Sequence, residues 1–346
     1  MNVLRALLIL IALAAFWNTL RHAELARAGA LILAIGPAVA LVLLPYVVAI
    51  SLQTLAYARI FRVLGRAPRF LPLLSVLLSS EAVLMSFPAG AALADSINPY
   101  LLKRRCAIPV TESLAGVAAK KSLIVLANAI YMGAALAGGF AYLHAVSRPL
   151  LGIPGLEWVV LAATLGLFLG ALGMSWAMLS GALAERSHGL LSRIPSKRLA
   201  DWLSQRKSGF LETDRHFEQL FRHRRSGLLL SIALLTAMWL VEGLETLVIL
   251  RLLQVDLSLR QVLSFEVVVT LLRSLAFMIP AGLGVQDAGY VAFFGAFAVP
   301  EAATVGVAFV LIKRFKELFW VAIGFLLIAF LKESPTAGEA SKPTPR

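Results

Sequence analysis

Long hydrophobic segments alternate with short polar ones along the chain. Five of these segments reach or exceed the roughly 20 residues that a helix needs to cross the ~30 Å hydrocarbon layer of a membrane. They are residues 28–57, 117–143, 150–179, 228–250 and 302–331. None alternates with the two-residue period of a β-strand, and lipid offers no partner to an unpaired backbone group. The pattern therefore predicts an all-α, polytopic transmembrane bundle.

The first 28 residues fit two interpretations. Arg5, the apolar run at residues 6–16 and the triplet Ala26-Arg27-Ala28 resemble a signal peptide with its cleavage site. Residues 3–17 are also long enough for a short or tilted helix. We expect this segment to be retained, since the later helices do not need a cleaved signal, and the total is then six spans.

Two further hydrophobic stretches are interrupted by helix-breaking residues. Residues 71–87 lead into Pro-Ala-Gly at 88–90, and residues 262–279 lead into Pro-Ala-Gly-Leu-Gly at 280–284. Proline removes a helix hydrogen-bond donor and glycine weakens a helix, so both stretches should turn there. We predict two re-entrant hairpins, each of which enters the membrane and returns to the same side.

An internal repeat relates the two hairpins. In both, four residues separate the Pro-Ala-Gly triplet from an aspartate, Asp95 or Asp287, and an ionisable residue lies seven positions before the proline, Glu81 or Arg273. A second proline, a carboxylate and a basic pair follow each copy. We predict one membrane domain with repeats at about 28–143 and 228–332, a linking helix at 150–179, a polar segment at 185–225 and a polar tail at 333–346.

Basic residues set the expected orientation. Residues 59–69 contain four arginines and residues 103–105 read Lys-Arg-Arg, whereas the loops around 144–148 and 256–260 carry few charges. By the positive-inside rule the basic loops are cytoplasmic and the others periplasmic. Segment 185–225, with ten Lys or Arg against five acids, is either a cytoplasmic amphipathic helix or a solvated linker. The two hairpins then enter from opposite sides, as inverted repeats of secondary transporters do.

Composition agrees with a membrane protein and argues against other classes. Of the 346 residues, 60% are hydrophobic and 15% are charged, and the mean hydropathy is +0.84; soluble domains are about 45–50% apolar and 25% charged. Cys106 is the single cysteine, and the histidines show no metal-binding pattern. The net charge of +13 comes from the basic loops, and no basic stripe with interleaved aromatics suggests nucleic acid. We expect no metal, cofactor or nucleic acid.

Ionisable residues inside the hydrophobic segments are the candidates for function, because each costs about 2.5–3.5 kcal/mol to insert. We expect Lys120 and Lys121 to extend to the cytoplasmic surface, and Glu317 to pair with Lys313. Asp95 and Asp287 follow the helix breaks directly and are harder to explain as internal ion pairs. The remaining ones are Glu81, Glu242, Glu245, Glu266, Arg273, Arg314 and Lys316. The sequence contains no GxxxxGK[ST], GxSxG or HExxH motif.

The sequence resembles the flippase-type transmembrane region of lysylphosphatidylglycerol synthases, a family that includes stand-alone bacterial membrane proteins. The resemblance covers about residues 28–332 and rests on Ile-Pro-Ala-Gly-Leu-Gly-Val-Gln-Asp-Ala at 279–288 and on Tyr-Leu-Leu-Lys-Arg-Arg at 100–105 after Asp95. In the first hairpin, Ala94-Asp95 and Asn98 stand where the family usually has Gly-Glu and Arg. The run Lys-Arg-Phe-Lys-Glu-Leu at 313–318 with Trp320 resembles relatives associated with hopanoid export.

The resemblance implies translocation or export of a lipid at the bacterial inner membrane, without the lysyl-transferring domain. We predict that Arg273, Lys313 and Arg314 hold an acidic headgroup, and that Asp95 and Asp287 contact a cationic headgroup or carry a coupling proton. Membrane lipids and lipid-biosynthesis proteins are the expected partners. The predicted site comprises Glu81, Pro88, Gly90, Asp95, Tyr100, Arg273, Pro280, Gly282, Gly284, Gln286, Asp287, Lys313 and Arg314.

Two alternatives stay open at this point. One is a lipid-modifying membrane enzyme that uses Asp95 or Asp287 as acid or base. The other is a non-catalytic scaffold for a lipid-synthesis complex that binds through the basic segment at 185–225. The sequence names neither the lipid nor the energy source.

The expected orientation can be tested with one cysteine. In a Cys106→Ser background, Arg206→Cys should react with a membrane-impermeant maleimide only after the cytoplasmic face is opened, because residue 206 lies in the basic segment. Labelling of intact spheroplasts from outside would reverse the orientation.

Overall fold

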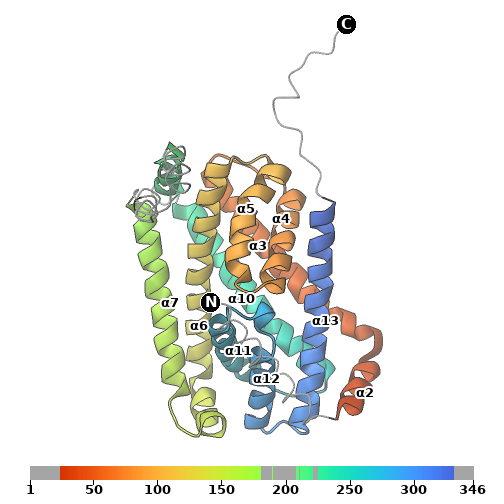
Figure 1. Cartoon of the computed structure of the whole chain (residues 1–346). Helices are drawn as coiled ribbons and strands as arrows, with labels where there is room; N and C mark the ends of the chain where they lie inside the picture. Colours follow the sequence, from red (N-terminus) through yellow and green to blue (C-terminus); the bar gives the residue numbers. More distant parts are fainter. Residues whose placement is uncertain (1–23, 181–188, 190–207, 210, 221–224, 331–346) are drawn as a thin grey trace.

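The computed structural model describes residues 24–180, 189, 208–209, 211–220 and 225–330 (Figure 1). The predicted first span at 3–17, most of segment 185–225 and the tail at 333–346 lie outside these residues. Over the described ranges the chain is helical and has no strand. Its elements are α2 (Leu25–Ile35), the 3-10 helix η1 (Gly36–Val42), α3 (Leu43–Val63), α4 (Phe70–Ser86), α5 (Gly90–Cys106), α6 (Val110–Leu151), α7 (Leu156–Leu179), α10 (Arg225–Leu252), α11 (Leu259–Leu275), the 3-10 helix η2 (Pro280–Gly282), α12 (Val285–Ala296) and α13 (Ala302–Ala329).

Four of the predicted spans coincide with helical segments that are long and apolar enough to cross a membrane. These segments are Leu25–Val63, Val110–Leu151, Leu156–Leu179 and Gly227–Leu252. The fifth, α13, has 28 residues, which gives a length of about 42 Å at 1.5 Å per residue. It carries four charged residues at positions 313–317, so its composition alone does not mark it as a span. The protein is therefore a multi-pass helical membrane protein.

The structure corrects two helix boundaries. The predicted span 28–57 is not one continuous α-helix, because Gly36 has a φ of 59° and Pro37 follows it, and the 3-10 helix η1 lies between α2 and α3. The predicted loop at 144–148 is helical: α6 continues to Leu151, and the chain turns at Gly152 and Gly155, both with positive φ.

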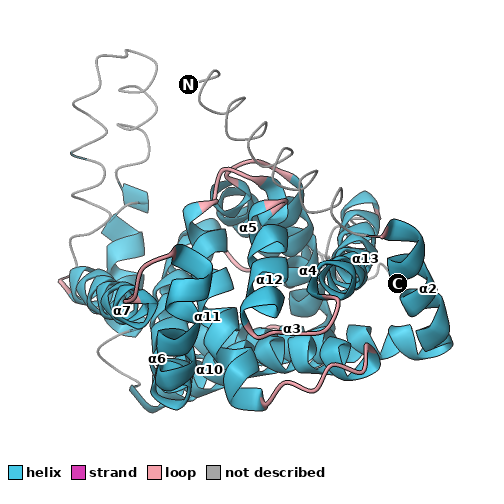
Figure 2. Ribbon diagram, turned by 90° about the horizontal axis from the view of Figure 1, so that it is seen from below, coloured by secondary structure: helices cyan, strands magenta, loops and turns pink. Residues whose placement is uncertain are grey.

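Long helices surround two short helical hairpins. The hairpin α4–α5 occupies one half of the bundle height and the pair α11–α12 occupies the other half (Figure 1). Helix α6 packs against both α5 and α11, and α13 packs against both α4 and α12. Seen along the bundle, α7 and α2 lie at opposite edges (Figure 2). Helix α4 contacts η2, so the two hairpins meet inside the bundle.

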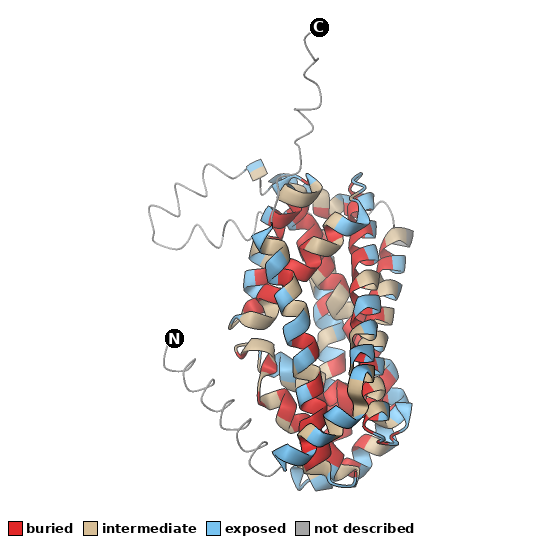
Figure 3. Ribbon diagram, turned by 90° about the vertical axis from the view of Figure 1, so that its right-hand side faces the viewer, coloured by how far each residue is buried: buried red, intermediate tan, exposed pale blue. Residues whose placement is uncertain are grey.

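Each hairpin has its own buried core. One cluster joins α3, α4, α5 and the first part of α6, with Tyr57, Phe61 and Leu77 among its buried side chains. The other joins the rest of α6 to α11, α12 and α13, and the Phe265 ring meets the Phe294 ring edge to face. Large apolar side chains also cover the outside: Trp176 of α7 is 70% exposed, as expected for a helix that faces lipid. Figure 3 shows buried residues inside the bundle and exposed ones around it.

The two hairpin turns share an unusual backbone conformation. The alanine of each Pro-Ala-Gly triplet is left-handed, with φ of 53° at Ala89 and 49° at Ala281, a conformation that costs a non-glycine residue about 1–2 kcal/mol. The match extends beyond the turns. Ala107 after α5 and Ala298 after α12 have φ of 53° and 54°, and the N–H of the next residue, Ile108 or Val299, returns to a carbonyl in the preceding helix.

The two basic loops lie together at one end of the bundle. Arg66, between α3 and α4, donates two hydrogen bonds to Glu112 at the start of α6, over 2.6 and 2.8 Å. Of segment 185–225, residues 211–220 are helical, Phe217 and Leu220 are buried, and Gln219 Nε2 donates to the Val63 carbonyl of α3 over 3.3 Å. This part of the segment packs on the bundle, which a fully solvated linker would not do.

Close contact between α6 and α11 requires glycine at one position. A Cβ at Gly139 would lie 2.5 Å from Ser264 Cβ and 3.2 Å from Ser264 Cα, whereas a Cβ at the adjacent Gly138 would meet nothing within 4 Å. Small residues at such crossings let two helices approach closely in a membrane. Glycine at position 139 therefore allows α11 to pack directly against the backbone of α6.

We expect Gly139→Ala to lower the thermal stability of the purified protein, because overpacking costs about 1–3 kcal/mol. Gly138→Ala is the matched control and should be neutral or stabilising, since alanine favours a helix by about 1 kcal/mol over glycine. Equal melting temperatures for the two variants in detergent would contradict the close packing of α6 on α11.

Candidate functional site

A cavity of about 360 Å³ lies where the two hairpins meet. Helices α3, α4, α6, α10, α11, α12 and α13, the first turn of α5 and η2 all contribute to its wall. Both hairpin turns reach it, through Gly90 and Gly282. Its polar lining comprises Tyr46, Gln53, Glu81, Lys121, Asn128, Tyr131, Trp239, Glu242, Glu245, Glu266, Thr270, Arg273, Ser274, Gln286, Tyr290, Lys313, Lys316 and Glu317.

The hairpin turns are built so that their backbone comes close to the cavity. A Cβ at Gly90 would lie 2.0 Å from the Leu84 carbonyl oxygen, so this turn of the first hairpin accepts no side chain. In the second hairpin Gly282 has a φ of 60°, and a Cβ there would lie 3.2 Å from Arg273 Cγ. The two glycines thus make room for a tight turn and for the arginine beside it.

Two lysines of α13 are fully engaged by carboxylates from neighbouring helices. Lys316 Nζ lies 2.8 and 3.0 Å from the carboxylate oxygens of Glu245 on α10. Lys313 Nζ donates to the Tyr290 hydroxyl over 2.7 Å and lies 3.5 Å from Glu266 of α11. Glu266 also accepts hydrogen bonds from Tyr290 and Thr246. Because every charge here has an opposite partner, this network joins α10, α11, α12 and α13 and offers little net charge to a ligand.

A second network fixes the turn of the α11–α12 hairpin. Arg314 Nη2 lies 2.7 and 2.8 Å from the two oxygens of Asp287, and Arg314 Nη1 lies 2.5 Å from Glu317. Asp287 also accepts the backbone N–H of Gly284 over 2.8 Å at the start of α12. Asp287 and Arg314 do not line the cavity, whereas Glu317 does, and it accepts a 3.4 Å hydrogen bond from Gln286.

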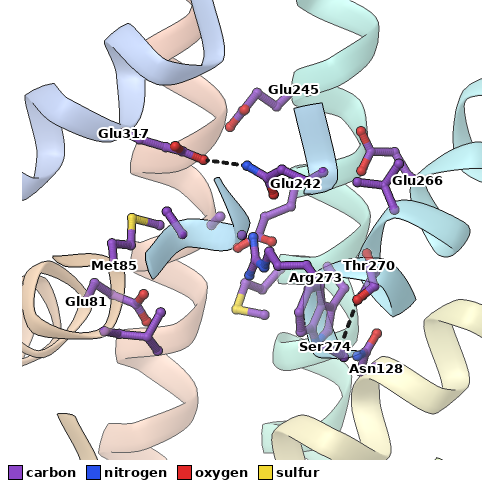
Figure 4. A pocket seen from close by; sticks show the side chains of 18 of the residues that line it. Glu81, Met85, Asn128, Glu242, Glu245, Glu266, Thr270, Arg273, Ser274 and Glu317 are labelled. Atoms are coloured by element: carbon purple, nitrogen blue, oxygen red, sulfur yellow. Dashed lines mark hydrogen bonds between the residues drawn. The ribbon is translucent and has the colours of Figure 1, made fainter. Parts of the chain in front are cut away.

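Three charged residues of the cavity remain without such a partner. Among the described residues, Glu81, Glu242 and Arg273 make no hydrogen bond through the charged group and no ion pair within 4 Å. Arg273 is exposed to the cavity, and Glu242, Glu317 and Glu81 are near enough to attract its guanidinium. In Figure 4 its side chain lies in the middle of the site, with Glu81 and Met85 on one side and Asn128 on the other. These groups are available to bind a ligand.

The structure brings part of the predicted site together. Glu81, Gly90, Arg273, Gly282, Gln286 and Lys313 line the cavity. Pro88, Pro280 and Gly284 belong to the turns beside it, and Asp287 and Arg314 form the network behind it. Asp95 forms a 3.0 Å ion pair with Lys121. Tyr100 is half exposed on α5, and the Arg104 guanidinium lies 5.3 Å from its ring.

Two predictions about charged side chains, one on pairing and one on exposure, are wrong. Glu317 pairs with Arg314 instead of Lys313, whose amine turns toward Tyr290 and Glu266. Lys120 does not extend to a surface: it is buried with its amine 4.9 Å from the Tyr57 ring centroid, where the aromatic face stabilises the cation.

Sequence reasoning left several cavity residues out of the predicted site. The predicted site omits five ionisable residues of the hydrophobic segments that line the cavity: Glu242, Glu245, Glu266, Lys316 and Glu317. Gln53 of α3 and Asn128 of α6, both buried, were not considered. One feature of the sequence identifies both the ionisable residues and the two amides: each is a polar side chain in the middle of an apolar helix. Among the described residues no group of His, Cys, Asp and Glu is arranged to hold a metal ion.

Comparison with known proteins identifies the family. Among the curated proteins and the solved structures, no significant match to this chain was found. The family model described as the lysylphosphatidylglycerol synthase TM region matches residues 3–328, which is nearly the whole chain and includes both hairpins and the cavity. The protein therefore belongs to the family of lysylphosphatidylglycerol synthase transmembrane regions.

Proposed function

We propose that this protein moves an amphipathic lipid, of the phospholipid or hopanoid type, between the leaflets of the bacterial inner membrane or out of it. The observation that carries the proposal is the cavity between the two hairpins, in which Arg273, Glu81 and Glu242 have no ion-pair partner among the described residues. Membership of a family of lipid-related membrane proteins supports it. The sequence has no nucleotide-binding motif, so transport is ion-coupled or runs downhill.

The hairpins are re-entrant in this proposal. Helices α4 and α5 have 17 residues each, which gives about 25 Å at 1.5 Å per residue, and α12 has only 12; a span needs roughly 20 residues. The two hairpins approach from opposite ends of the bundle (Figure 1), and their turns share left-handed Ala89 and Ala281. These features support an inverted repeat whose broken helices build the site, as in secondary transporters.

Ion pairs within the protein leave only one of the three basic residues predicted to bind the headgroup available. Lys313 and Arg314 are already neutralised by Glu266, Asp287 and Glu317. Arg273 has its guanidinium free to make bidentate hydrogen bonds to a phosphate. It is therefore the residue we assign to an anionic headgroup. Glu81 and Glu242 can balance a cation that accompanies the lipid, whether a headgroup amine or a coupling ion.

The first test removes the arginine. Arg273→Ala should reduce translocation of a fluorescent phospholipid in reconstituted vesicles about tenfold or more, since a hydrogen bond to a charged group contributes about 1.5–3 kcal/mol. Arg273→Lys should retain more activity. Arg251→Ala is the control, because Arg251 pairs with Asp256 at the far end of α10 and does not line the cavity.

Two outcomes would overturn the proposal. One is that vesicles containing the wild-type protein translocate lipid no faster than protein-free vesicles. The protein would then be a non-catalytic scaffold for a lipid-synthesis complex. Mass spectrometry that detects a new covalent lipid product would decide for a membrane enzyme.

The second test separates structure from transport. Asp287→Asn removes one of the two carboxylates on buried Arg314, and breaking a buried ion pair costs about 3–5 kcal/mol. We expect a clear loss of thermal stability in detergent. Asp95→Asn should change it little, because the Asp95–Lys121 pair is partly exposed. An unchanged melting temperature with reduced transport would instead assign Asp287 a direct role in moving the lipid.

A further inference from the structure

The cavity wall and the outer surface of the bundle share the last turn of α11. Arg273 and Ser274 line the cavity and are exposed. Phe277, just beyond the helix, also lines it and is 65% exposed, and Leu275 between them is 80% exposed. A residue that both lines a cavity and is largely exposed marks an opening. The cavity is therefore open beside the end of α11.

This opening lies between the two hairpins. On its other side, Ala91 in the first turn of α5 lines the cavity, and Phe87 and Leu93 next to it are each 44% exposed. Helices α4–α5 and α11–α12 occupy opposite halves of the bundle height (Figure 1), and the opening lies where they meet. The opening is thus at mid-height of the bundle, where a membrane protein is surrounded by lipid tails and not by water.

The chemistry changes abruptly across the opening. Inside are the Arg273 guanidinium, the Ser274 hydroxyl and the Asn128 amide, whose Oδ1 is buried and accepts no hydrogen bond from the described residues. Outside are the apolar side chains of Phe87, Leu93, Leu275 and Phe277, and the one charged group beside them on α5, Asp95, is neutralised by Lys121. A water-soluble solute gains nothing from an apolar rim, whereas a lipid has a polar headgroup and apolar tails that match the two zones.

We infer that the cavity opens sideways into the bilayer between the first turn of α5 and the last turn of α11, and that a phospholipid inserts its phosphate headgroup there while its acyl chains stay outside against Leu275 and Phe277. The phosphate binds Arg273, and the tails cover the exposed apolar rim. This inference rests on the proposed function and adds the route by which the lipid reaches the site. Because the acyl chains stay outside, the cavity of about 360 Å³ accommodates only the headgroup.

The test measures lipid at the rim and asks whether Arg273 holds it there. A photo-crosslinking p-benzoylphenylalanine replaces Phe277 in one protein and Leu318 in another, in vesicles of dioleoyl phosphatidylglycerol and dioleoyl phosphatidylcholine. Leu318 is the matched control, because it lies on α13, is 68% exposed and does not line the cavity. Each protein is irradiated with Arg273 intact, with Arg273→Ala and with Arg273→Lys, and lipid adducts are measured by mass spectrometry.

We expect Arg273→Ala to reduce the lipid adduct at position 277 about tenfold, with partial recovery in Arg273→Lys, because the charged hydrogen bonds to the phosphate are lost. The adduct at position 318 should change less than about twofold, because only general lipid contact acts there. That second position also reports whether the variant is folded and inserted.

The inference is overturned if the adduct at position 277 is independent of Arg273, or if position 277 cross-links to another part of this chain in place of lipid. Its failure is distinct from failure of the proposed function. Normal translocation with an Arg273-independent adduct would reject the lateral entry and keep the transporter. An Arg273-dependent adduct without translocation would keep the lateral site and reject transport.

Discussion

The structure depends on one constraint: a charge within an apolar bundle must find an opposite charge or a polar partner, because lipid and core offer no water. Helix α13 shows how this constraint determines packing. Lys316 reaches Glu245 of α10, Lys313 reaches Glu266 of α11, and Arg314 reaches Asp287 of α12. About one turn of α13, residues 313–316, therefore holds three other helices in a defined register. Buried ion pairs add little net stability but leave few alternative arrangements, since any shift leaves a charge uncompensated.

The same constraint separates structural charges from those that can act on a ligand. A side chain that is neutralised by a direct ion pair has little binding energy left for a headgroup, whereas Arg273, Glu81 and Glu242 form no ion pair within 4 Å among the described residues. Arg273 and Glu81 occupy equivalent places in the two hairpins, seven residues before the proline of the turn. The two hairpins thus place one positive and one negative group at the same cavity. Such a combination suits a ligand that carries charge into an otherwise apolar membrane protein.

Backbone strain at the hairpins is consistent with a functional origin. Ala89, Ala281, Ala107 and Ala298 are all left-handed, although alanine has no intrinsic preference for this region. Strained residues persist where the surrounding structure demands them, and such positions are common at binding sites. Ala89 and Ala281 lie in the two hairpin turns, and these turns reach the cavity through Gly90 and Gly282.

The sequence by itself determined the membrane class, four of the helical spans, both hairpin turns and the family, because each of these depends on local composition or on residues close in the chain. Hydrophobic length indicates a span, and Pro-Ala-Gly indicates a break, whatever surrounds them. Only the tertiary structure decided which charges pair. Glu317 with Arg314, Lys120 over Tyr57 and Lys121 with Asp95 depend on which helices lie side by side and how they are rotated. The cavity likewise arises from residues of eight α-helices and η2 that are distant in sequence, and no local pattern encodes their distances.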